Sequence, residues 1–260
     1  MQIKKQIKSS SYLLKGLIGF LSFLLLWILL TSTGLVKPFF LPSPLSVISA
    51  TIKLFTEFSL FSDILISVYR ILTGFILVIL VAVPLGILVG VNNKLGEYLE
   101  PIAIFFRYIP PSAFIPLSIV WFGVGEVEKL FILFVSGAPW MFFLTLDSVR
   151  NTKKEFIEAG YTLGASKSQI YSKVIFPSSL PGIWDAMRLI ISTLWTFVIV
   201  AELIAANSGL GHVIIQSQRF LQTANVIAII IIIGILGLIT DYLFKIGYKK
   251  FFPWTERVRG

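Results

Sequence analysis

Few side chains in this sequence are of a type that does covalent or metal chemistry. There is no cysteine and a single histidine, His212, which excludes thiol nucleophiles, disulfides and cysteine–histidine metal sites. No serine, histidine and acid set or carboxylate pair has a spacing suited to hydrolysis, so we predict no catalytic residue. Four charges lie inside long apolar stretches: Arg70, Arg107, Arg188 and Glu202. Because a charge at membrane depth is costly, each of them marks a candidate functional site.

The composition requires lipid as the solvent for much of the surface. Of the 260 residues, 56% are hydrophobic and only 13% are charged, and the mean hydropathy is +0.90. A soluble domain of average composition has about 25% charged residues. Since this chain cannot cover a surface that faces water, we predict an all-α membrane protein that forms one compact helical unit.

Six apolar stretches have the length of about 20 residues that a spanning helix needs, or nearly so. They cover residues 12–30, 64–91, 102–121, 129–149, 183–205 and 226–248. The first follows a basic start, but no small-residue cleavage site follows it, so we expect a retained span and not a signal peptide. Residues 40–58 carry periodic apolar positions after a proline-bracketed turn, and we expect a helix at the outer interface there. The stretch "GLGHVIIQSQRF" is expected to place a short helix in an outer loop.

The positive charges fix the expected orientation. With the N-terminus in the cytoplasm, fifteen of the 22 Lys and Arg residues fall on the cytoplasmic side, many of them in residues 150–173 and at the two chain ends. The opposite side holds Lys37, Lys53 and Arg219, with Lys129 at a boundary. This asymmetry is the positive-inside pattern of six spans with both ends in the cytoplasm. The net charge of +9 therefore reflects topology, and nucleic acid is excluded as a partner.

Prolines interrupt several of the predicted spans. A proline removes a backbone donor and kinks a helix, and in lipid the freed carbonyls need neighbouring groups or a water-filled cavity. Kinked helices around a cavity would suit transport, although proline and glycine are also simply common in membrane helices. The residues concerned are Pro84, Pro110, Pro111, Pro116 and Pro139.

One polar, basic loop lies between the fourth and fifth stretches, with the sequence "EAGYTLGASKSQIYSKVIFP" over residues 158–177. Glu158, Ala159 and Gly160 begin a face of small residues, and Gly164 breaks the helix one turn later. A solvated loop would carry long charged side chains on this surface. Small side chains let another backbone approach closely, so the surface is predicted to face a protein partner.

The second arm of the loop restarts as a helix. Ser166 is its expected N-cap, and Pro177 and Pro181 are expected to end it. The loop is therefore predicted to be a helix–turn–helix.

The loop resembles the EAA loop of importer-type ABC permeases. Gly160 stands where Ala is usual, and Val174 and Phe176 match the pattern in residue class while replacing the usual Ile and Leu. The stretches "FLPSP", "SVYRILTGFILVILVAVPLGILVG", "FFRYIPPSAFIPLSIVWFG" and "LWTFVIVAELIAANSGLG" are similar to the nitrate, aliphatic-sulfonate, taurine and bicarbonate permease group, and the resemblance runs from about Phe40 to the C-terminus. The positions that match the EAA pattern are Glu158, Ala159, Gly164, Val174, Phe176 and Pro177.

This resemblance implies the type I importer fold with six transmembrane helices. Residues 1–11 would be a cytoplasmic tail, and residues 12–260 a single permease domain in the bacterial inner membrane, with a cytoplasmic coupling loop at 150–180. Two such subunits, usually identical, would form the pathway, two ATPase subunits would dock inside, and a periplasmic or lipid-anchored binding protein would deliver the solute. ATP and Mg²⁺ would be bound by the ATPase partner, because this chain has no phosphate-binding loop; the chain itself would bind no cofactor.

The candidate site residues form two groups, the first implied by this resemblance and the second indicated by charged and polar side chains at membrane depth. The ATPase-coupling residues would be Glu158, Ala159, Gly160, Leu163, Gly164, Ala165 and Pro177. The candidates for the translocation pathway are Arg107, Ser112, Arg188, Ser192, Trp195, Thr196 and Glu202.

Each pathway candidate also has a structural interpretation. Arg188 and Arg70 lie near span ends, where their side chains can snorkel to the interface. Arg107 can either bind an anion in the pathway or form a structural ion pair within the protein. For Glu202 a structural role, pairing an arginine, is favoured, because a carboxylate is a poor ligand for an anion. The polar side chains of the fifth stretch suit helix–helix hydrogen bonds equally well.

The predicted function is the permease subunit of an ATP-driven importer for a small anion of the nitrate, bicarbonate, taurine or aliphatic-sulfonate class. A neutral nutrient such as a thiamine-precursor pyrimidine is an alternative substrate. A secondary transporter driven by an ion gradient would be expected to show inverted repeats, and the two halves show none. An intramembrane enzyme would need an acid–base pair at a useful spacing.

Overall fold

The computed structural model describes residues 9–255 and contains helices but no β-strand in that range. The predicted cytoplasmic tail lies largely outside the described residues, as do Arg257 and Arg259. In chain order the helices are α1 (Ser9–Ser32), α2 (Pro44–Glu57), α3 (Leu60–Val91), α4 (Asn93–Tyr108), the 3₁₀ turn η1 (Pro111–Phe114), α5 (Ile115–Phe122), α6 (Glu126–Arg150), α7 (Lys154–Thr162), α8 (Lys167–Ile170), the π turn η2 (Tyr171–Ile175), α9 (Phe176–Ala205), α10 (Leu210–Arg219) and α11 (Thr223–Phe251).

These helices form two compact units. Unit 1 combines Met1–Leu60 with Ile214–Ile231, and unit 2 combines Phe61–Val213 with Ile232–Gly260. Both α10 and α11 begin in one unit and continue into the other.

Five helical stretches are long and apolar enough to cross a membrane, among the described residues. A sixth crossing is formed if α4 and the η1–α5 segment are taken as one span, and these two segments are bent by 87° at Ile109 and Pro110. The predicted break at the paired prolines is therefore confirmed. Backbone of this irregular kind is tolerated at membrane depth only where it is buried in protein or lines a water-filled cavity.

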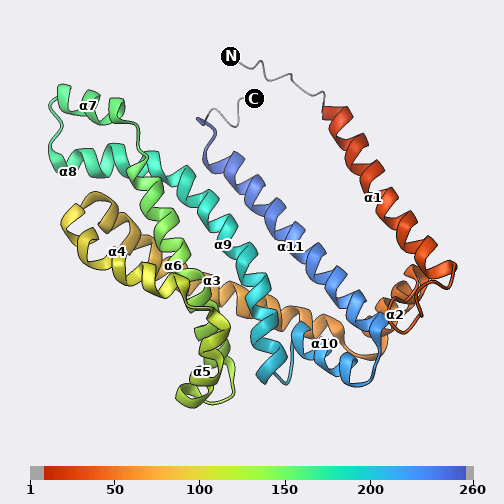
Figure 1. The fold of residues 1–260 in the computed structure, drawn as a ribbon. Helices are drawn as coiled ribbons and strands as arrows, with labels where there is room; N and C mark the ends of the chain where they lie inside the picture. The colour runs from red at the N-terminus through yellow and green to blue at the C-terminus, as the bar shows by residue number, and fades with distance from the viewer. Residues whose placement is uncertain (1–8, 256–260) are drawn as a thin grey trace. The chain divides into compact units, whose positions relative to one another are not determined.

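Unit 2 is built around α3, α6 and α9, with α6 and α9 packed along much of their length. Glycines on α3 let α6 approach closely. A Cβ atom at Gly86 would lie 2.7 Å from Cβ of Thr145, and one at Gly90 would lie 2.6 Å from Cγ1 of Val149. Small residues of this kind are the usual means by which membrane helices pack. Within this unit, α7 and α8 lie at one end of α6 and α9, and α5 lies at the other end (Figure 1).

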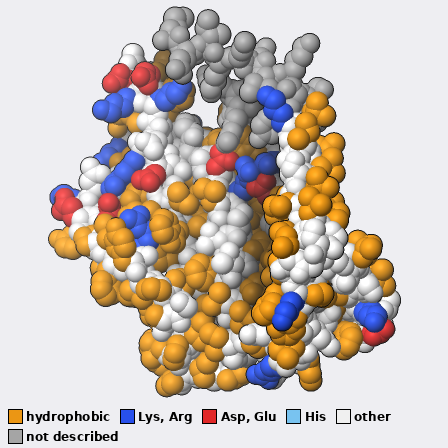
Figure 2. Space-filling model, turned by 45° about the vertical axis from the view of Figure 1, so that its right-hand side comes forward, with side chains coloured by type: hydrophobic (Ala, Val, Ile, Leu, Met, Phe, Trp, Pro, Cys, Tyr) orange, Lys and Arg blue, Asp and Glu red, His pale blue; other side chains and the backbone are white. Residues whose placement is uncertain are grey.

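Hydrophobic side chains are exposed along most of the long helices. Examples in unit 2 are Leu80 with 66% of its surface exposed and Leu238 with 71%. Apolar side chains are spread widely over the surface that Figure 2 shows. Exposed apolar area on this scale requires lipid or protein against it, as the composition predicts.

Unit 1 contains the predicted helix after the proline-bracketed turn. Helix α2 begins with Pro44 in its first turn, and the Ser43 hydroxyl accepts a hydrogen bond from the Ser46 amide at 3.2 Å. This is the expected N-cap geometry. The predicted short helix in the last loop is also present, as α10.

Candidate functional site

The predicted coupling loop is a helical hairpin formed by residues 154–175, which comprise α7, α8 and η2. Its turn is set by Gly164, whose φ of +80° is strained for any residue with a side chain. The Gly164 amide donates to the Tyr161 carbonyl at 2.9 Å, and the Ala165 amide donates to the Gly160 carbonyl at 3.0 Å. This pair of bonds is the Schellman motif that ends a helix at a glycine. The glycine is therefore required by the backbone of the turn.

The second arm starts with a capping box, so the predicted N-cap at Ser166 is confirmed. The Ser166 hydroxyl accepts from the Gln169 amide at 3.4 Å, and the Gln169 side chain accepts from the Ser166 amide at 2.8 Å. These two bonds satisfy donors that the first turn of a helix leaves free.

The expectation that Pro177 and Pro181 end the second arm is wrong. Helix α8 continues through the π turn into α9, in which Pro177 lies in the first turn and Pro181 inside the helix. The π turn makes this continuation possible, since the Phe176 amide donates to the Tyr171 carbonyl five residues back. A proline in the first turn of the next helix then costs no hydrogen bond. The hairpin is thus joined rigidly to α9.

Apolar contacts hold the two arms of the hairpin together. Ile170 and Ile175 are buried with Val149 of α6, and Ile157 and Val174 pack against them. The hairpin therefore rests on the end of α6 as well as on α9.

Gly160 does not lie on the open surface that the sequence suggested. A Cβ atom there would lie 2.5 Å from Cδ1 of Ile170, so Gly160 faces the second arm and lets the arms approach closely. The expectation was wrong because the orientation of Gly160 depends on how Ile170 packs across the hairpin.

The open side of α7 carries an apolar stripe, formed by Phe156, Ala159 and Leu163. These residues are spaced three and four apart, so they share one face of the helix. Phe156 and Leu163 are 51% and 87% exposed, and Ala159 is also exposed. Among the other predicted coupling residues, Glu158, Gly164 and Pro177 are exposed and Ala165 is half-buried.

A second polar region, the ionic cluster, lies in unit 2 around Arg70 of α3. It comprises Asp63, Ser67, Arg70, Glu126, Glu202, Ser208 and the backbone of residues 209–211. Arg70 is 1% exposed and Glu202 of α9 is fully buried. The Arg70 guanidinium donates to Glu202 at 2.8 Å and, through two nitrogens, to Glu126 of α6 at 2.8 and 2.5 Å. The predicted pairing of Glu202 with an arginine is confirmed, and Arg70 does not snorkel to the interface.

The loop between α9 and α10 is tied into the same cluster. Arg70 donates to the Ser208 carbonyl at 2.8 Å, and the Gly211 amide donates to Glu202 at 2.8 Å. The Gly209 amide donates to Asp63 at 2.6 Å. Gly209 has a φ of +102°, and a Cβ atom there would lie 2.5 Å from the Glu202 carboxylate.

Three helices and one loop therefore meet at a single guanidinium. The sequence analysis did not identify Asp63 or Glu126 as members, because acidic residues in the first turn of a helix are expected there as ordinary favourable charges.

The other charged pathway candidate on α9 also has a carboxylate partner. Arg188 donates from Nε to Asp241 of α11, which also accepts from Lys245 at 2.8 Å. Trp195, which is buried, donates to the Thr240 hydroxyl of α11 at 3.3 Å. These contacts fit the helix–helix alternative given for the fifth stretch. Asp241 was missed although a lone acid in an apolar stretch is itself a signal.

The remaining polar candidates are exposed. Ser192 donates to the Arg188 carbonyl one turn back at 3.0 Å, and Thr196 lies one turn further along α9. Ser112 is exposed in the 3₁₀ turn η1. The assignment of these residues to a pathway stays a prediction.

Arg107 differs from the other two arginines. Its guanidinium carbon lies 4.8 Å from the ring centroid of Phe143, 5.1 Å from that of Trp140 and 5.5 Å from that of Tyr108. Distances of this kind are cation–π contacts. Within residues 9–255, no carboxylate pairs with Arg107.

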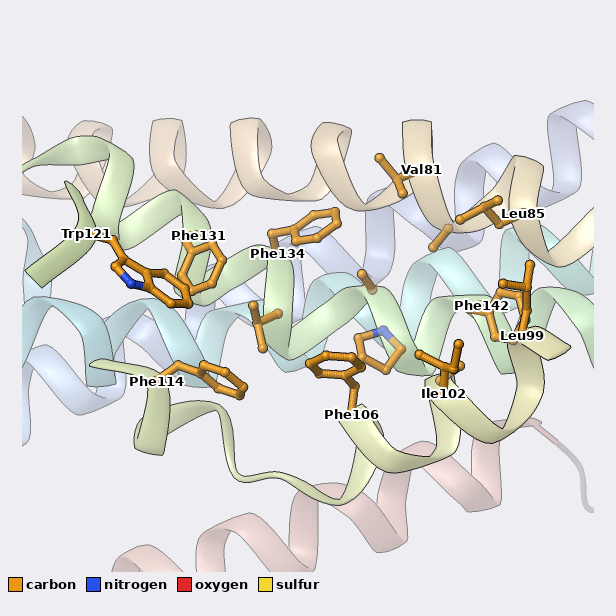
Figure 3. Close-up of a pocket in the computed structure, with 15 residues that line it drawn as sticks. Val81, Leu85, Leu99, Ile102, Phe106, Phe114, Trp121, Phe131, Phe134 and Phe142 are labelled. Carbon is orange, nitrogen blue, oxygen red and sulfur yellow. The ribbon is translucent and has the colours of Figure 1, made fainter. Parts of the chain in front are cut away.

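An apolar pocket of about 500 Å³ is lined by residues that neighbour this arginine and its aromatic contacts in sequence. Its lining comes from α3, α4, α6 and the bent segment after α4, and the aromatic rings point into it (Figure 3). Phe106 and Phe142 line the pocket and are the sequence neighbours of Arg107 and Phe143. The labelled residues are Val81, Leu85, Leu99, Ile102, Phe106, Phe114, Trp121, Phe131, Phe134 and Phe142.

Comparison with known proteins identifies relatives over most of the chain. Residues 82–252 match the family described as binding-protein-dependent transport system inner membrane component. A probable ABC transporter permease protein of Brucella abortus (strain 2308) is 37% identical over 89% of this chain and 91% of its own length. The putative aliphatic sulfonates transport permease protein SsuC of Bacillus subtilis (strain 168) is 31% identical, over 95% and 90%. The taurine transport system permease protein TauC of Escherichia coli (strain K12) is 30% identical, over 93% and 90%.

A solved structure supports the same fold. An inward-facing conformation of the MetNI methionine ABC transporter contains a chain with 22% identity and a TM-score of 0.66, covering 74% of this chain and 95% of that one. At this level of identity, the likeness establishes a shared fold.

Proposed function

The chain belongs to the family of binding-protein-dependent transport system inner membrane components, with the fold of type I ABC importer permeases, and from this premise we propose that it imports a small oxyanion. As the permease subunit of an ABC importer, it is a transport protein in the inner membrane. We also propose that two copies form the pathway, that a separate ATPase binds the hairpin, and that a binding protein delivers the solute.

One observation carries the coupling part of the proposal: the apolar stripe on α7. Helix α7 lies outside the membrane-length helices, whereas the second arm of the hairpin is continuous with the long apolar stretch Lys167–Ile204, and Leu163 at the end of α7 is 87% exposed. An apolar stripe on a short helix is stabilised when it lies in a groove of another protein. The sequence pattern of the hairpin, together with its geometry, supports the ATPase as that protein.

The connections of the hairpin to α6 and α9 would let it transmit a displacement to both helices. It follows the end of α6 at Arg150 and leads directly into α9 at Phe176. Because these two helices pack along each other and the hairpin core includes Val149 of α6, a displacement of the hairpin would move both helices. ATP binding and hydrolysis in the partner would thereby change the access to the pathway.

The proposed orientation places the hairpin and both chain ends in the cytoplasm. The support is the concentration of lysine and arginine in and around the hairpin, at positions 150, 153, 154, 167 and 173. Cysteines introduced at Ser9 and Gln218 would be labelled from opposite sides of the membrane if this orientation holds. Labelling of both from one side would contradict it.

The substrate class rests on the named relatives. The name of one relative refers to aliphatic sulfonates, and the name of another refers to taurine, which is itself a sulfonate. We propose the sulfonate or a similar small oxyanion as the solute for this chain.

The test is reconstitution of the permease with its ATPase and its binding protein in vesicles. Methanesulfonate, taurine, nitrate and bicarbonate are added one at a time, and ATP hydrolysis and uptake are measured. We expect at least one of these anions to stimulate both. Stimulation only by a neutral pyrimidine or a sugar would contradict the proposal of an oxyanion substrate. Uptake driven by an ion gradient without ATP would contradict the ATP-driven mechanism.

A further inference from the structure

Arg107 differs from the other described arginines of unit 2 because it has no carboxylate partner among residues 9–255. Three other arginines in unit 2 each pair with a carboxylate: Arg70 with Glu126 and Glu202, Arg150 with Glu100, and Arg188 with Asp241. The Arg107 guanidinium lies over three aromatic rings, and within residues 9–255 no carboxylate or hydrogen-bond acceptor pairs with its N–H groups.

The aromatic rings hold this guanidinium without neutralising it. Phe143 and Trp140 come from α6, and Tyr108 follows Arg107 on α4. The ring faces attract the cation, but they accept none of its hydrogen bonds in the way that a carboxylate does. A guanidinium offers five N–H donors in a planar fork, which matches the geometry of an oxyanion. Arg107 is therefore held in place with its donors available.

The place of Arg107 in the fold also indicates a ligand. It lies in the last turn of α4, two residues before the 87° bend. Irregular backbone of this kind occurs at membrane depth only against protein or a water-filled cavity. A charged side chain in such a position faces the protein interior or a cavity, because contact with lipid is costly.

We propose that Arg107 binds the oxyanion group of the solute as it crosses the membrane, with Phe143, Trp140 and Tyr108 as the cradle that positions the guanidinium. This inference rests on the proposed function, since it requires an anionic solute. The same chemistry would suit the phosphate of a lipid head group, and the experiment separates these two sources.

The experiment uses the complete importer complex in vesicles, with the wild type, Arg107→Lys and Arg107→Met. Uptake of methanesulfonate and of nitrate is measured, together with complex assembly and ATP hydrolysis without binding protein. We expect Arg107→Met to lower the uptake rate at least tenfold and Arg107→Lys to restore part of it. Assembly and basal hydrolysis should stay within about twofold of the wild type. Arg219→Met, on the exposed end of α10, is the matched control and should leave uptake unchanged.

Uptake by Arg107→Met at the wild-type rate would overturn the inference while leaving the proposed function intact. A loss of uptake that is accompanied by an equal loss of assembly in both variants would indicate a structural role and would also overturn it. The stimulation of ATP hydrolysis by the solute-loaded binding protein is also measured in detergent free of phospholipid. A defect of Arg107→Met that is present in phospholipid vesicles and absent in phospholipid-free detergent would assign Arg107 to a lipid head group and contradict the solute site. If the wild-type complex responds to no anion, the proposed substrate and this inference both fail.

Discussion

The ionic cluster and the hairpin are stabilised by different kinds of interaction. The cluster joins three helices and a loop through one buried arginine, Arg70, which is 1% exposed and pairs with the buried Glu202 and the half-exposed Glu126. The hairpin is held by apolar packing and backbone caps, and it leaves an apolar stripe uncovered. A region whose polar groups are all engaged inside the chain fixes a structure. A region that exposes apolar side chains on a rigid support presents a surface to another protein.

The difference predicts that substitutions in the two regions affect different properties. Changes in the ionic cluster should lower the free energy of unfolding. Changes on the apolar stripe should leave that free energy nearly unchanged and weaken an association instead.

The largest expected effect follows from removing the central cation. Arg70→Met leaves the buried Glu202 and the half-exposed Glu126 without their partner, and breaking a buried pair in this way costs about 3–5 kcal/mol. The unfolding of the purified protein in detergent, as a function of temperature or denaturant, measures this loss.

A double-mutant cycle sharpens that result. Arg70→Met combined with Glu202→Gln removes both buried charges, so the double variant should be more stable than the sum of the two single losses predicts. Strict additivity of the two losses would mean that the ion pair does not fix the cluster.

Two glycines with a positive φ provide the next comparison. Gly209→Ala combines a strained backbone with a Cβ atom 2.5 Å from the Glu202 carboxylate, and we expect a loss of about 3 kcal/mol. Gly164→Ala has the same kind of strain but open space around the new methyl group, so the loss should be about 1 kcal/mol. Equal losses at the two positions would show that the packing of the cluster around Gly209 does not matter.

Within the ionic cluster, the smallest effect is expected at its edge. The side chain of Glu126 is 50% exposed, so solvent screens its attraction to Arg70. Glu126→Gln should therefore cost only about 1 kcal/mol, because a neutral amide still accepts hydrogen bonds from the guanidinium. A loss as large as that of Arg70→Met would place Glu126, and not Glu202, as the main partner.

The sequence was most informative where the structure is local. The turn of the hairpin depends on one glycine and one capping serine, Gly164 and Ser166, and both were identified because caps and turns are specified within a few residues. The orientation of Gly160 and the continuation through Pro177 were mispredicted. These features depend on packing between the arms and on the π turn, which no short-range pattern indicates.

The ionic cluster was less predictable, for a related reason. The need of Glu202 for an arginine follows from its burial in an apolar stretch, but Arg70 is 132 residues away in the chain. Three arginines were available as partners, and only the packing of α3 against α9 decides among them. In the same way, the pairing of Arg188 with Asp241 depends on how α9 meets α11.

The central claim is that the apolar stripe binds the ATPase, and Leu163→Asp tests it most directly. The variant places a charge where an exposed apolar side chain should be buried on association, and its expected cost of at least 2 kcal/mol corresponds to about a 30-fold weaker complex. Ser168→Asp, which adds the same charge to an exposed position of the second arm, is the control. Co-purification of the ATPase with the permease is measured with the unfolding temperature of each variant. The account predicts that Leu163→Asp loses the ATPase while its unfolding temperature and the control stay at wild-type values. A Leu163→Asp permease that retains the ATPase and imports at the wild-type rate would contradict it.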